Sequence, residues 1–587
     1  MMWLYKTASI FGGSSFIKVF PAEIPMSKIT IMPIGKEIEV AEGENLLSAV
    51  RRAGAAIQSP CNGEGSCGKC LVRVEGDKAP ETPHKNLSRK KSEEGWRLAC
   101  RVAPDLDMTI HLAEDFSLDA RILEGDRISG IPLTPAPKVT QEGGRFKLSY
   151  GKEPERVVLT DWEEGYSPKG LAIDIGTTTL VATLFSLETG DELGTASAIN
   201  PQVDFGHDVL TRIQKGSTPE GLAELMDVLS KGFEKMIEEL LSESGAKRGE
   251  ILDVVIGGNT TMLQIAGGFD PAPLGRFPFT VGISGGQTYP ATRFGLKLNS
   301  LARVYIPPVA HAFVGSDITV GLIATNFFHR DGNILFVDIG TNGEMGLSTA
   351  GKKLVTSAAA GPAFEGMGIA AGMRAAKGAI EEVSAKGGEL SIKVIGGGEA
   401  KGICGSGIID ATAALLSLGV IDATGKMRAP EEAEDVAPKV RDRLEVIEGK
   451  PVFRLAEGVY FTQNDVRQIQ LAKSAVRTAI ESMLSEGGVR PEELDALILA
   501  GAFGYHLKPE SLETIGLIPS GLIKRITFAG NTSRTGSAML LLDLNLRAEL
   551  EEKMSTVKHI GLAEGKEFQK RFIEHIGFTD LTAGKES

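Results

Sequence analysis

The stretch Leu171-Ala-Ile-Asp174-Ile-Gly176-Thr177-Thr178-Thr179-Leu180 has a second copy farther along the chain, Ile334-Leu-Phe-Val-Asp338-Ile-Gly340-Thr341-Asn342-Gly343-Glu344. In both copies an apolar run ends in aspartate and is followed by a Gly-Thr turn. The residues after the turn again have a strand-like pattern, so each copy is predicted to be the loop of a β-hairpin. A Walker loop or a dinucleotide-binding loop would instead join a strand to a helix.

Such a loop has the residue types that bind phosphate. Glycine lets main-chain N–H groups approach phosphate oxygens, threonine hydroxyls add donors, and an aspartate at the strand end can hold hydrated Mg²⁺ on the same phosphates. A single copy would be interpreted as an ordinary hairpin turn. Two copies indicate an internal duplication in which two facing loops clamp a polyphosphate.

Three further segments accompany the two loops. Leu499-Ala-Gly501-Ala-Phe-Gly504 follows an apolar strand, and Gly530-Asn531-Thr532-Ser533-Arg534-Thr-Gly536 leads into the apolar run Ala538 to Leu542. Gly402-Ile-Cys404-Gly405-Ser406-Gly407-Ile-Ile-Asp410 fits either another nucleotide-facing turn or a helix N-terminus that packs tightly because glycine is small. The whole pattern resembles the phosphate and adenosine motifs of the superfamily of acetate and sugar kinases, heat-shock chaperones and actin, whose two ribonuclease-H-like halves close over ATP.

This resemblance implies roles for particular residues. Asp174 and Asp338 are expected to organise Mg²⁺, and Glu344 is the candidate for polarising an attacking water molecule. The residues expected to contact ATP, at its phosphates or its adenosine, are Gly176, Thr177, Thr178, Gly340, Thr341, Asn342, Gly405, Ser406, Gly501 and Gly504.

Four of the five cysteines are close together in the first part of the chain. Cys61, Cys67 and Cys70 share one glycine-rich loop, and Cys100 follows farther on. An iron-sulfur cluster needs four thiolates around its irons, and glycines let the loop backbone wrap closely around it. The spacing differs from that of plant ferredoxins and resembles that of adrenodoxin-like ferredoxins. We therefore predict that these four cysteines hold a 2Fe-2S cluster.

Two alternatives stay open for this group of cysteines. A structural zinc site also fits Cys-x2-Cys with a further cysteine, although the usual paired knuckles are missing. Disulfides are disfavoured because so few cysteines in so long a chain do not form a secreted disulfide framework. The fifth cysteine, Cys404, is expected to be a small core residue in an apolar, glycine-rich setting.

Composition limits the partners of the protein. With 76 acidic against 63 basic residues the formal net charge is -13, and no basic block stands out, so nucleic acid is not an expected partner. No stretch approaches the ~20 apolar residues of a membrane span. The first 26 residues are interpreted as a leader or as a start assigned too far upstream, since Gly12, Gly13, Lys18 and Pro21 interrupt any signal-peptide core. We expect a cytoplasmic protein with reduced cysteines.

The chain is long enough for several domains at roughly 150 residues each. We predict an α/β and α+β multidomain protein, and Pro219 to Glu243 and Asn464 to Leu484 are expected to be helices. The expected parts are a leader at 1–26, a β-grasp 2Fe-2S ferredoxin domain at 27–114, a linker and small connecting domain at 115–168, a two-lobed ribonuclease-H-like ATPase domain at 169–546 with lobes at about 169–330 and 331–546, and a polar C-terminal tail at 547–587.

The combination of the two parts resembles the reductive activators of corrinoid proteins found in anaerobes, over nearly the whole chain from residue 27. The segments that carry this resemblance are Gly257-Gly-Asn259-Thr260-Thr261-Met262, Val314-Gly315-Ser-Asp317, Asp338-Ile-Gly-Thr-Asn-Gly-Glu344 and Ala360-Gly361-Pro362-Ala363-Phe364-Glu365-Gly366. The resemblance implies that one electron passes from the 2Fe-2S cluster to a cob(II) cofactor and regenerates cob(I), driven by ATP. It implies as partners a corrinoid iron-sulfur protein or the corrinoid protein of a methyltransferase system, an upstream electron donor, and a second copy of the chain.

Three other functions stay open at this point. A small-molecule kinase shares the fold but leaves the ferredoxin domain unexplained. A chaperone-like clamp would make the cluster a structural staple. An ATP-dependent electron activator of another low-potential enzyme shares the chemistry, although such activators usually place a cluster between two subunits, and this chain lacks the extra paired cysteines for it.

Overall fold

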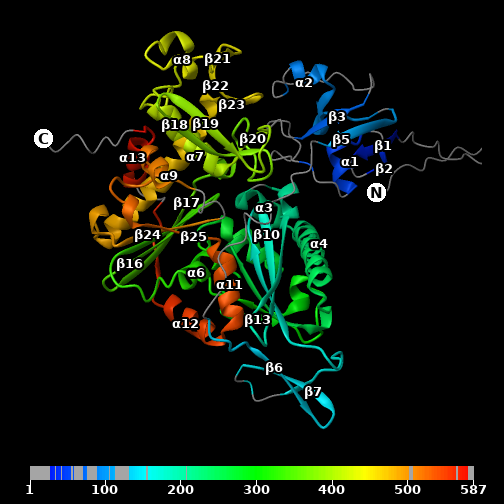
Figure 1. Ribbon diagram of the computed structural model, residues 1–587. Helices are drawn as coiled ribbons and strands as arrows, with labels where there is room; N and C mark the ends of the chain where they lie inside the picture. The colour runs from blue at the N-terminus through cyan, green and yellow to red at the C-terminus, as the bar shows by residue number, and fades with distance from the viewer. Residues whose placement is uncertain are drawn as a thin grey trace, which may run out of the picture. The chain divides into compact units, whose positions relative to one another are not determined.

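The computed structural model describes residues 27–32, 35–40, 43–53, 57, 70–75, 87, 89–104, 106–112, 131–151, 153, 156–206, 208–501, 507–562 and 566–578. The expected leader, Cys61, Cys67 and Gly504 lie outside these residues. The chain divides into two compact units, Met1–Asp115 and Phe116–Ser587 (Figure 1).

The first unit is a mixed sheet with a helix packed on it. Its strand order is β2-β1-β5-β3-β4, in which β1 and β5 are parallel and the other neighbours are antiparallel. Ile29 and Ile31 of β1 and Leu46 of α1 are fully buried in one core, as expected when alternate strand residues face a helix. This is the predicted β-grasp arrangement. Its elements are β1 (Ser27–Met32), β2 (Lys36–Val40), α1 (Leu46–Arg52), β3 (Leu71–Val74), α2 (Arg89–Glu93), β4 (Trp96–Leu98) and β5 (Met108–Leu112).

The second unit contains two six-stranded sheets, β11-β10-β9-β12-β14-β13 and β25-β24-β15-β16-β17-β26, which share the arrangement of five strands. The sixth strand differs, because β13 pairs with β14 in the first sheet and β26 pairs with β17, at the opposite edge, in the second. In each sheet three strands form an antiparallel meander, and two later strands add in parallel beside the first strand of that meander. The duplication that the sequence indicated therefore extends to five strands of each sheet. We call the parts built on the first and second sheets the first and second lobe.

The first lobe is formed by β9 (Lys169–Ile175), β10 (Thr179–Ser186), β11 (Glu192–Ile199), α3 (Val209–Gly216), α4 (Pro219–Ser244), β12 (Ile251–Gly258), α5 (Thr260–Ala266), β13 (Gln287–Pro290), β14 (Arg303–Ile306) and α6 (Ser316–Ala324). α4 matches the predicted helix from Pro219 and packs against β10 and β11. It begins at a Thr218 cap followed by proline and ends at Gly245 in the left-handed conformation, the sequence signals that start and stop helices.

The second lobe is formed by β15 (Ile334–Ile339), β16 (Gly343–Thr349), β17 (Lys352–Ala358), β18 (Ala379–Lys386), β19 (Glu389–Val394), β20 (Gly402–Ile403), α7 (Gly405–Ser417), α8 (Pro438–Arg441), β21 (Leu444–Ile447), β22 (Lys450–Ala456), β23 (Val459–Thr462), α9 (Gln463–Gly487), β24 (Ala496–Ala500), α10 (Pro509–Thr514) and β25 (Ile526–Gly530). The second predicted helix, from Asn464, is thus also present as α9. Its buried face belongs to the largest apolar core of the chain's described part, together with β15, β16 and α7.

The lobes are not separate in sequence, because two helices from the end of the chain pack on the first lobe. These are α11 (Thr532–Leu542) and α12 (Leu544–Met554). α11 lies beside α6 (Figure 1) and also packs against β9 and β12. Its Arg534 donates hydrogen bonds to Thr183 and Glu192 of the first sheet. On α12, Arg547 forms a buried ion pair of 2.5 Å with Asp253 of β12. The expected second lobe, at about 331–546, therefore includes a helix that packs on the first lobe.

The segment expected to be a C-terminal tail is part of the fold. α12 continues past the expected boundary, β26 (Lys558–His559) adds to the second sheet beside β17, and α13 (Lys566–Glu574) packs on α9. Phe578 is buried in the core of the second lobe. The polar composition of this segment reflects half-exposed helices rather than the absence of structure.

The connecting segment forms a small antiparallel sheet of β6 (Pro137–Glu142), β7 (Arg145–Tyr150) and β8 (Val157–Val158). The hydroxyl of Tyr150 donates to the carbonyls of Leu252, at 2.6 Å, and Leu301, at 2.9 Å, so this sheet is anchored on the first lobe. Within the part of the chain that the structure describes, no helix is long and apolar enough to cross a membrane.

Candidate functional site

Both predicted phosphate loops are hairpin turns. β9 and β10 pair antiparallel on either side of the first loop, and β15 and β16 on either side of the second. The N–H of Gly176 donates to the carbonyl of Thr179 at 2.9 Å, and that of Gly340 to the carbonyl of Asn342 at 3.1 Å. A Cβ atom at Gly176 would lie 2.7 Å from the Thr179 carbonyl oxygen, so this turn requires glycine.

Neighbouring side chains hold the first loop in place. Asn200 donates from Nδ2 to the carbonyl of Gly176 at 2.8 Å, and its main-chain N–H donates to the carbonyl of Thr178 at 3.0 Å. Arg212 of α3 is fully buried and donates to the carbonyl of Thr177. Burial lowers the pKa of Arg212 to about 9, so its guanidinium is still charged at neutral pH. A buried cation thus adjoins the main chain of the loop, where it favours a bound anion.

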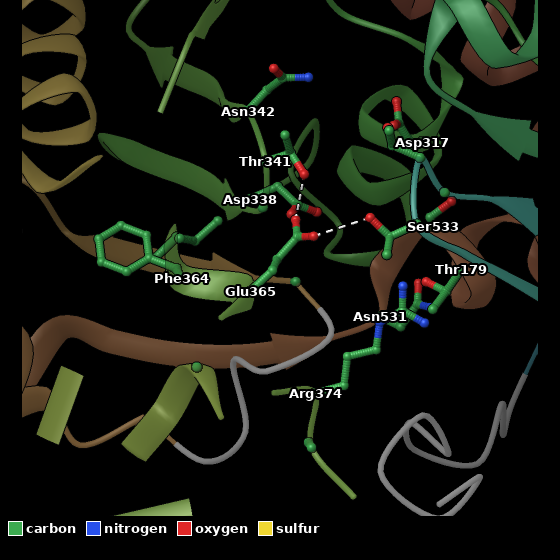
Figure 2. Close-up of a pocket in the computed structure, with 18 of the residues that line it drawn as sticks. Thr179, Asp317, Asp338, Thr341, Asn342, Phe364, Glu365, Arg374, Asn531 and Ser533 are labelled. Atoms are coloured by element: carbon green, nitrogen blue, oxygen red, sulfur yellow. Dashed lines mark hydrogen bonds between the residues drawn. The ribbon is translucent and has the colours of Figure 1, made fainter. Parts of the chain in front are cut away.

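A cavity of about 250 Å³ lies between the two hairpins, close to the lower end of the range for small-molecule sites, ~300–1,000 Å³. Every predicted ATP-contacting residue that the structure describes lines this cavity, and so do Asp174, Asp338 and Glu344. Asn531 and Ser533, from the start of α11, complete it (Figure 2). The fold therefore brings motifs from distant parts of the sequence to one site.

The carboxylates of the cavity raise one another's pKa. Burial, with the charges of Asp174 and Glu365, raises the pKa of Asp338 to about 7. Burial, with the charges of Asp174 and Asp338, raises that of Asp317 to about 8. Burial and the same kind of neighbours raise the pKa of Glu344 well above its ordinary value. So many like charges in a buried site require a cation for their ionised forms.

The donor set suits Mg²⁺, which prefers oxygen ligands. Among the residues that the structure describes, no three histidine, cysteine or acidic side chains already converge as ligands of one metal ion. Mg²⁺ usually binds through one or two carboxylates and takes its remaining ligands from water and phosphate. Asp174 and Asp338, one at the end of the first strand of each hairpin, fit that requirement.

Asp174 is held by residues that begin α11. Ser533 donates from its hydroxyl to Oδ1 of Asp174 at 2.7 Å, and Asn531 donates from Nδ2 to Oδ2 at 3.1 Å. Burial raises the pKa of Asp174, and these two hydrogen bonds partly offset that rise. Asn531 also caps α11 by accepting from the N–H of Arg534. α11 thus contributes its first turn to the site.

Glu365 connects the two loops. Its Oε1 accepts from the hydroxyl of Thr341 at 2.6 Å (Figure 2). Its Oε2 accepts from the hydroxyl of Thr178 at 3.2 Å. It ends a 3-10 helix, Pro362–Glu365, that is flanked by Gly361 and Gly366, both with positive φ. Its carboxylate marks the place where hydroxyl donors of both hairpins meet.

Sequence reasoning assigned no role to several residues of the cavity, namely Asp317, Glu365, Arg374, Asn531 and Ser533. Four of these residues lie inside motif segments quoted in the sequence analysis, so their positions could have indicated that they belong to the site. Arg374 lies outside every such motif. Only the fold brings it to the cavity.

The start of α7 and the loop after β24 form another part of the lining. Gly501 has a φ of 114°, and a Cβ there would lie 2.7 Å from the carbonyl oxygen of Ile339. A Cβ at Gly407 would lie 2.2 Å from the carbonyl oxygen of Ile380, while Gly405 and Ser406 line the cavity. This turn thus packs tightly, as one interpretation of the Gly402–Asp410 segment expected, and it also faces the cavity; its contact with a nucleotide stays a prediction.

The fifth cysteine, Cys404, occupies the N-cap position of α7 without a capping hydrogen bond from its side chain. It is buried beside Met373, Ala376 and Ala379, as expected of a small core residue, and it also lines the cavity. Burial raises the pKa of its thiol.

In the first unit, two of the four predicted cluster ligands are adjacent. The sulfur atoms of Cys70 and Cys100 are 3.3 Å apart and both side chains are buried. This separation is well beyond the ~2.05 Å of a disulfide bond and allows both thiolates to bind one iron. The residues fit half of a 2Fe-2S site.

Comparison with known families matches three consecutive stretches of the chain. Residues 29–105 match the 2Fe-2S iron-sulfur cluster binding domain, 169–330 the RACo middle region, and 332–584 the C-terminal domain of RACo, described as the ASKHA domain. Among solved structures, the chain is similar to a reductive activator for corrinoid, iron-sulfur protein, with 30% sequence identity and a TM-score of 0.69, over 94% of this chain and 98% of that chain. The chain belongs to the family of corrinoid reductive activators.

Other members of this family are alike over most of their length. The corrinoid activation enzyme RamQ of Eubacterium limosum is 28% identical, over 93% of this chain and 98% of its own. The [Co(II) methylated amine-specific corrinoid protein] reductase of Methanosarcina barkeri is 27% identical, over 70% of this chain and 77% of its own. Membership of the reductive activator family confirms the predicted fold class and supports the 2Fe-2S cluster over zinc. The ASKHA domain likewise supports ATP as the nucleotide.

Proposed function

We propose that the chain uses ATP to drive the one-electron reduction of cobalt, from Co(II) to Co(I), in the cofactor of a corrinoid protein. The observation that carries this proposal is that one chain joins a ferredoxin unit, with Cys70 beside Cys100, to a cavity between two phosphate-binding hairpins. A kinase would not need the ferredoxin unit, and a simple ferredoxin would not need the cavity between the phosphate-binding hairpins.

The cluster would be held by Cys61, Cys67, Cys70 and Cys100. When bound, a 2Fe-2S group of the plant type supplies single electrons at about -400 mV. This potential is marginal for the reduction of a corrinoid Co(II). The proposal therefore assigns the missing free energy to ATP.

We assign different residues of the cavity to different parts of Mg-ATP. We assign Mg²⁺ to Asp174 and Asp338, the phosphates to the turns at Gly176–Thr178 and Gly340–Asn342, and the adenosine to Gly405, Ser406, Gly501 and Gly504. Because the two turns belong to different lobes, a polyphosphate held by both favours the conformation in which the lobes are close together. That population shift is the step we couple to electron transfer.

Two carboxylates are candidates for orienting the attacking water, Glu344 and Glu365. Glu344 is buried and its neighbours raise its pKa, which favours its neutral form. Glu365 instead accepts hydrogen bonds from Thr178 and Thr341, at the place where the terminal phosphate would lie between the loops. We therefore favour Glu365 and retain Glu344 as the alternative.

The remaining parts of the proposal concern partners and location. Each cycle requires an upstream one-electron donor that reduces the cluster again. We propose that the protein acts in the cytoplasm. We also propose that it is a homodimer, and light scattering of the purified full chain can test this oligomeric state. We also retain 27–114 and 115–168 as proposed domain boundaries, and we extend the ATP-binding domain from residue 169 past 546, because β26 joins its second sheet and α13 packs on α9.

The decisive experiment is an anaerobic mixture of the reduced full-length protein, Mg-ATP and a corrinoid protein in the Co(II) state. We expect the absorption band of Co(I) to appear only when nucleotide is present. A Co(I) band of equal size and rate without nucleotide would reduce the ATP-binding domain to a regulator. Turnover of ATP that depends on a sugar or carboxylic acid instead would favour a kinase.

A further inference from the structure

The cavity between the hairpins is lined by many more acidic than basic side chains. The acidic side chains that line it are Asp174, Asp317, Asp338, Glu344, Glu365 and Glu381. Among the described residues of its lining, Arg374 alone carries a permanent positive charge. A nucleoside triphosphate adds several more negative charges, and one divalent ion does not balance them all. The guanidinium of Arg374 is therefore the one side-chain cation of the described lining that is available to offset the charge of a bound nucleotide.

The guanidinium of Arg374 also lacks a complete set of hydrogen bonds. Its Nη1 is buried and has no hydrogen-bond partner among the residues that the structure describes. A guanidinium has five N–H donors in a fixed planar arrangement, and a buried donor without an acceptor is unfavourable. Such groups in native proteins call for an explanation, and an absent ligand is one of those explanations.

The position of Arg374 indicates which part of a ligand it would meet. The carboxylate of Glu365 is the charged neighbour that acts on Arg374, and this carboxylate accepts from the hydroxyls of both phosphate loops. Figure 2 shows the Arg374 side chain extending into the cavity, toward Asn531 and Thr179. Arg374 belongs to the second lobe, whereas Thr179 begins β10 of the first. Its guanidinium thus lies at the phosphate end, where the lobes face each other.

We propose that Arg374 binds the terminal phosphate of ATP and lets the protein distinguish ATP from ADP. This inference rests on the ATP-binding role proposed above. An arginine fork binds two phosphate oxygens at once, which suits a planar donor group more than a lysine. The terminal phosphate would satisfy the buried Nη1, offset the acidic lining and connect the second lobe to the first hairpin. ADP would leave Nη1 without its acceptor.

The test compares the affinity of the full-length protein for a non-hydrolysable ATP analogue and for ADP, by titration calorimetry with Mg²⁺ present. In Arg374→Gln we expect the affinity for the analogue to fall about 10- to 100-fold, the range for a lost hydrogen bond to a charged group, and the affinity for ADP to change little. Arg374→Lys should lie between, because it keeps the charge and loses the fork. The matched control is Lys377→Gln, which removes an exposed cation of the same segment.

Each outcome decides the proposal. An equal loss of affinity for both nucleotides would mean that Arg374 binds the inner phosphates or has a structural role. No loss of affinity would mean that Arg374 does not contact the nucleotide. Either result overturns the inference. A wild-type protein that binds neither nucleotide would instead refute the proposed ATP site itself. Because the readout is a ratio of two affinities in one preparation, partial unfolding of a variant does not produce the expected result. We also expect the unliganded Tm of Arg374→Gln not to fall, since Nη1 has no partner to lose.

Discussion

Ser533 donates a hydrogen bond of 2.7 Å from its hydroxyl to Oδ1 of Asp174. These residues are far apart in sequence, and the bond connects the first turn of α11 to the end of β9. The helix that closes the fold therefore also orients the carboxylate that we assign to Mg²⁺. An outer partner of this kind sets the direction in which a carboxylate presents its second oxygen.

From this relationship we expect Ser533→Ala to weaken Mg²⁺-dependent ATP hydrolysis by about 10-fold, the lower end for loss of an outer-shell partner. Asp174→Asn should cause a larger loss, because it removes the ligand charge itself. Hydrolysis rates measured over a Mg²⁺ titration check both, and the affected variants should need more Mg²⁺. Asp227→Asn, at an exposed position of α4, is the control. Equal rates in Asp174→Asn and the control would contradict the assignment.

Substitution of the two candidate carboxylates for water activation should lower ATP hydrolysis to different extents. Glu365→Gln should lower kcat for ATP hydrolysis by about 100-fold, the lower end for a general base, while nucleotide affinity holds or improves because a negative charge is removed. Glu344→Gln should cost less, since burial and its acidic neighbours raise the pKa of Glu344 and favour its neutral form. Single-turnover hydrolysis separates kcat from binding. The larger loss in Glu344→Gln would restore the original expectation for that residue.

Cysteine substitutions test the cluster separately from the nucleotide site. Cys100→Ser should abolish the visible spectrum and lower the iron content of anaerobically purified protein, while binding of ADP is unchanged. Cys404→Ser provides the matched control, because Cys404 lies in the second unit beside Met373 and is not a predicted cluster ligand. Zinc, found by elemental analysis in wild-type protein in place of iron, would count against the electron-transfer function.

The C-terminal helix should detach at acid pH. Burial raises the pKa of Glu481, but hydrogen bonds from His575, at 2.8 Å, and Arg477, at 2.7 Å, outweigh it and bring the pKa to about 2. A carboxylate whose pKa is lower in the folded state stabilises the fold above its unfolded pKa of about 4.3, and this stabilisation is lost as pH falls toward 2.

We therefore expect Glu481→Gln to cost about 2 kcal/mol at neutral pH and much less near pH ~3. Hydrogen exchange of residues 566–578 at the two pH values measures this locally, because α13 packs on α9. Glu486→Gln, an exposed position on the same helix, should show no such difference between the two pH values. Equal protection of the wild type at both pH values would show that Glu481 does not hold the helix.

Much of the fold was predictable from local patterns. Each phosphate loop combines an aspartate, a glycine and threonines within a few residues, so the strand-turn-strand reading of Asp174 and Asp338 needed no tertiary information. The helices from Pro219 and Asn464 have long apolar periodicity and clear N-terminal caps. Such signals are contained in one contiguous window, which is why they were read correctly.

The parts that were missed depend on contacts between distant segments. Arg374 reaches the cavity only because the segment after the 3-10 helix at Pro362–Glu365 folds back toward the first hairpin. The packing of α11 on the first lobe was not predicted, because nothing in the sequence of α11 says that Arg534 will bond to Thr183. The end of the chain was expected to be a tail because its half-exposed helices are polar in composition. Contacts of this kind form only when the fold brings distant segments together, so no single stretch of the sequence predicts them.

The packing of α11 on the first lobe also determines how this protein could be divided experimentally. Ala538 and Leu541 of α11 cover Ala172 and Val255 of the first sheet, and all four are buried in one cluster. A truncated product that stops at residue 330 would present this apolar sheet face to solvent and should be recovered from inclusion bodies. Co-expression with a peptide corresponding to α11 and α12 should rescue it, in the manner of fragment complementation.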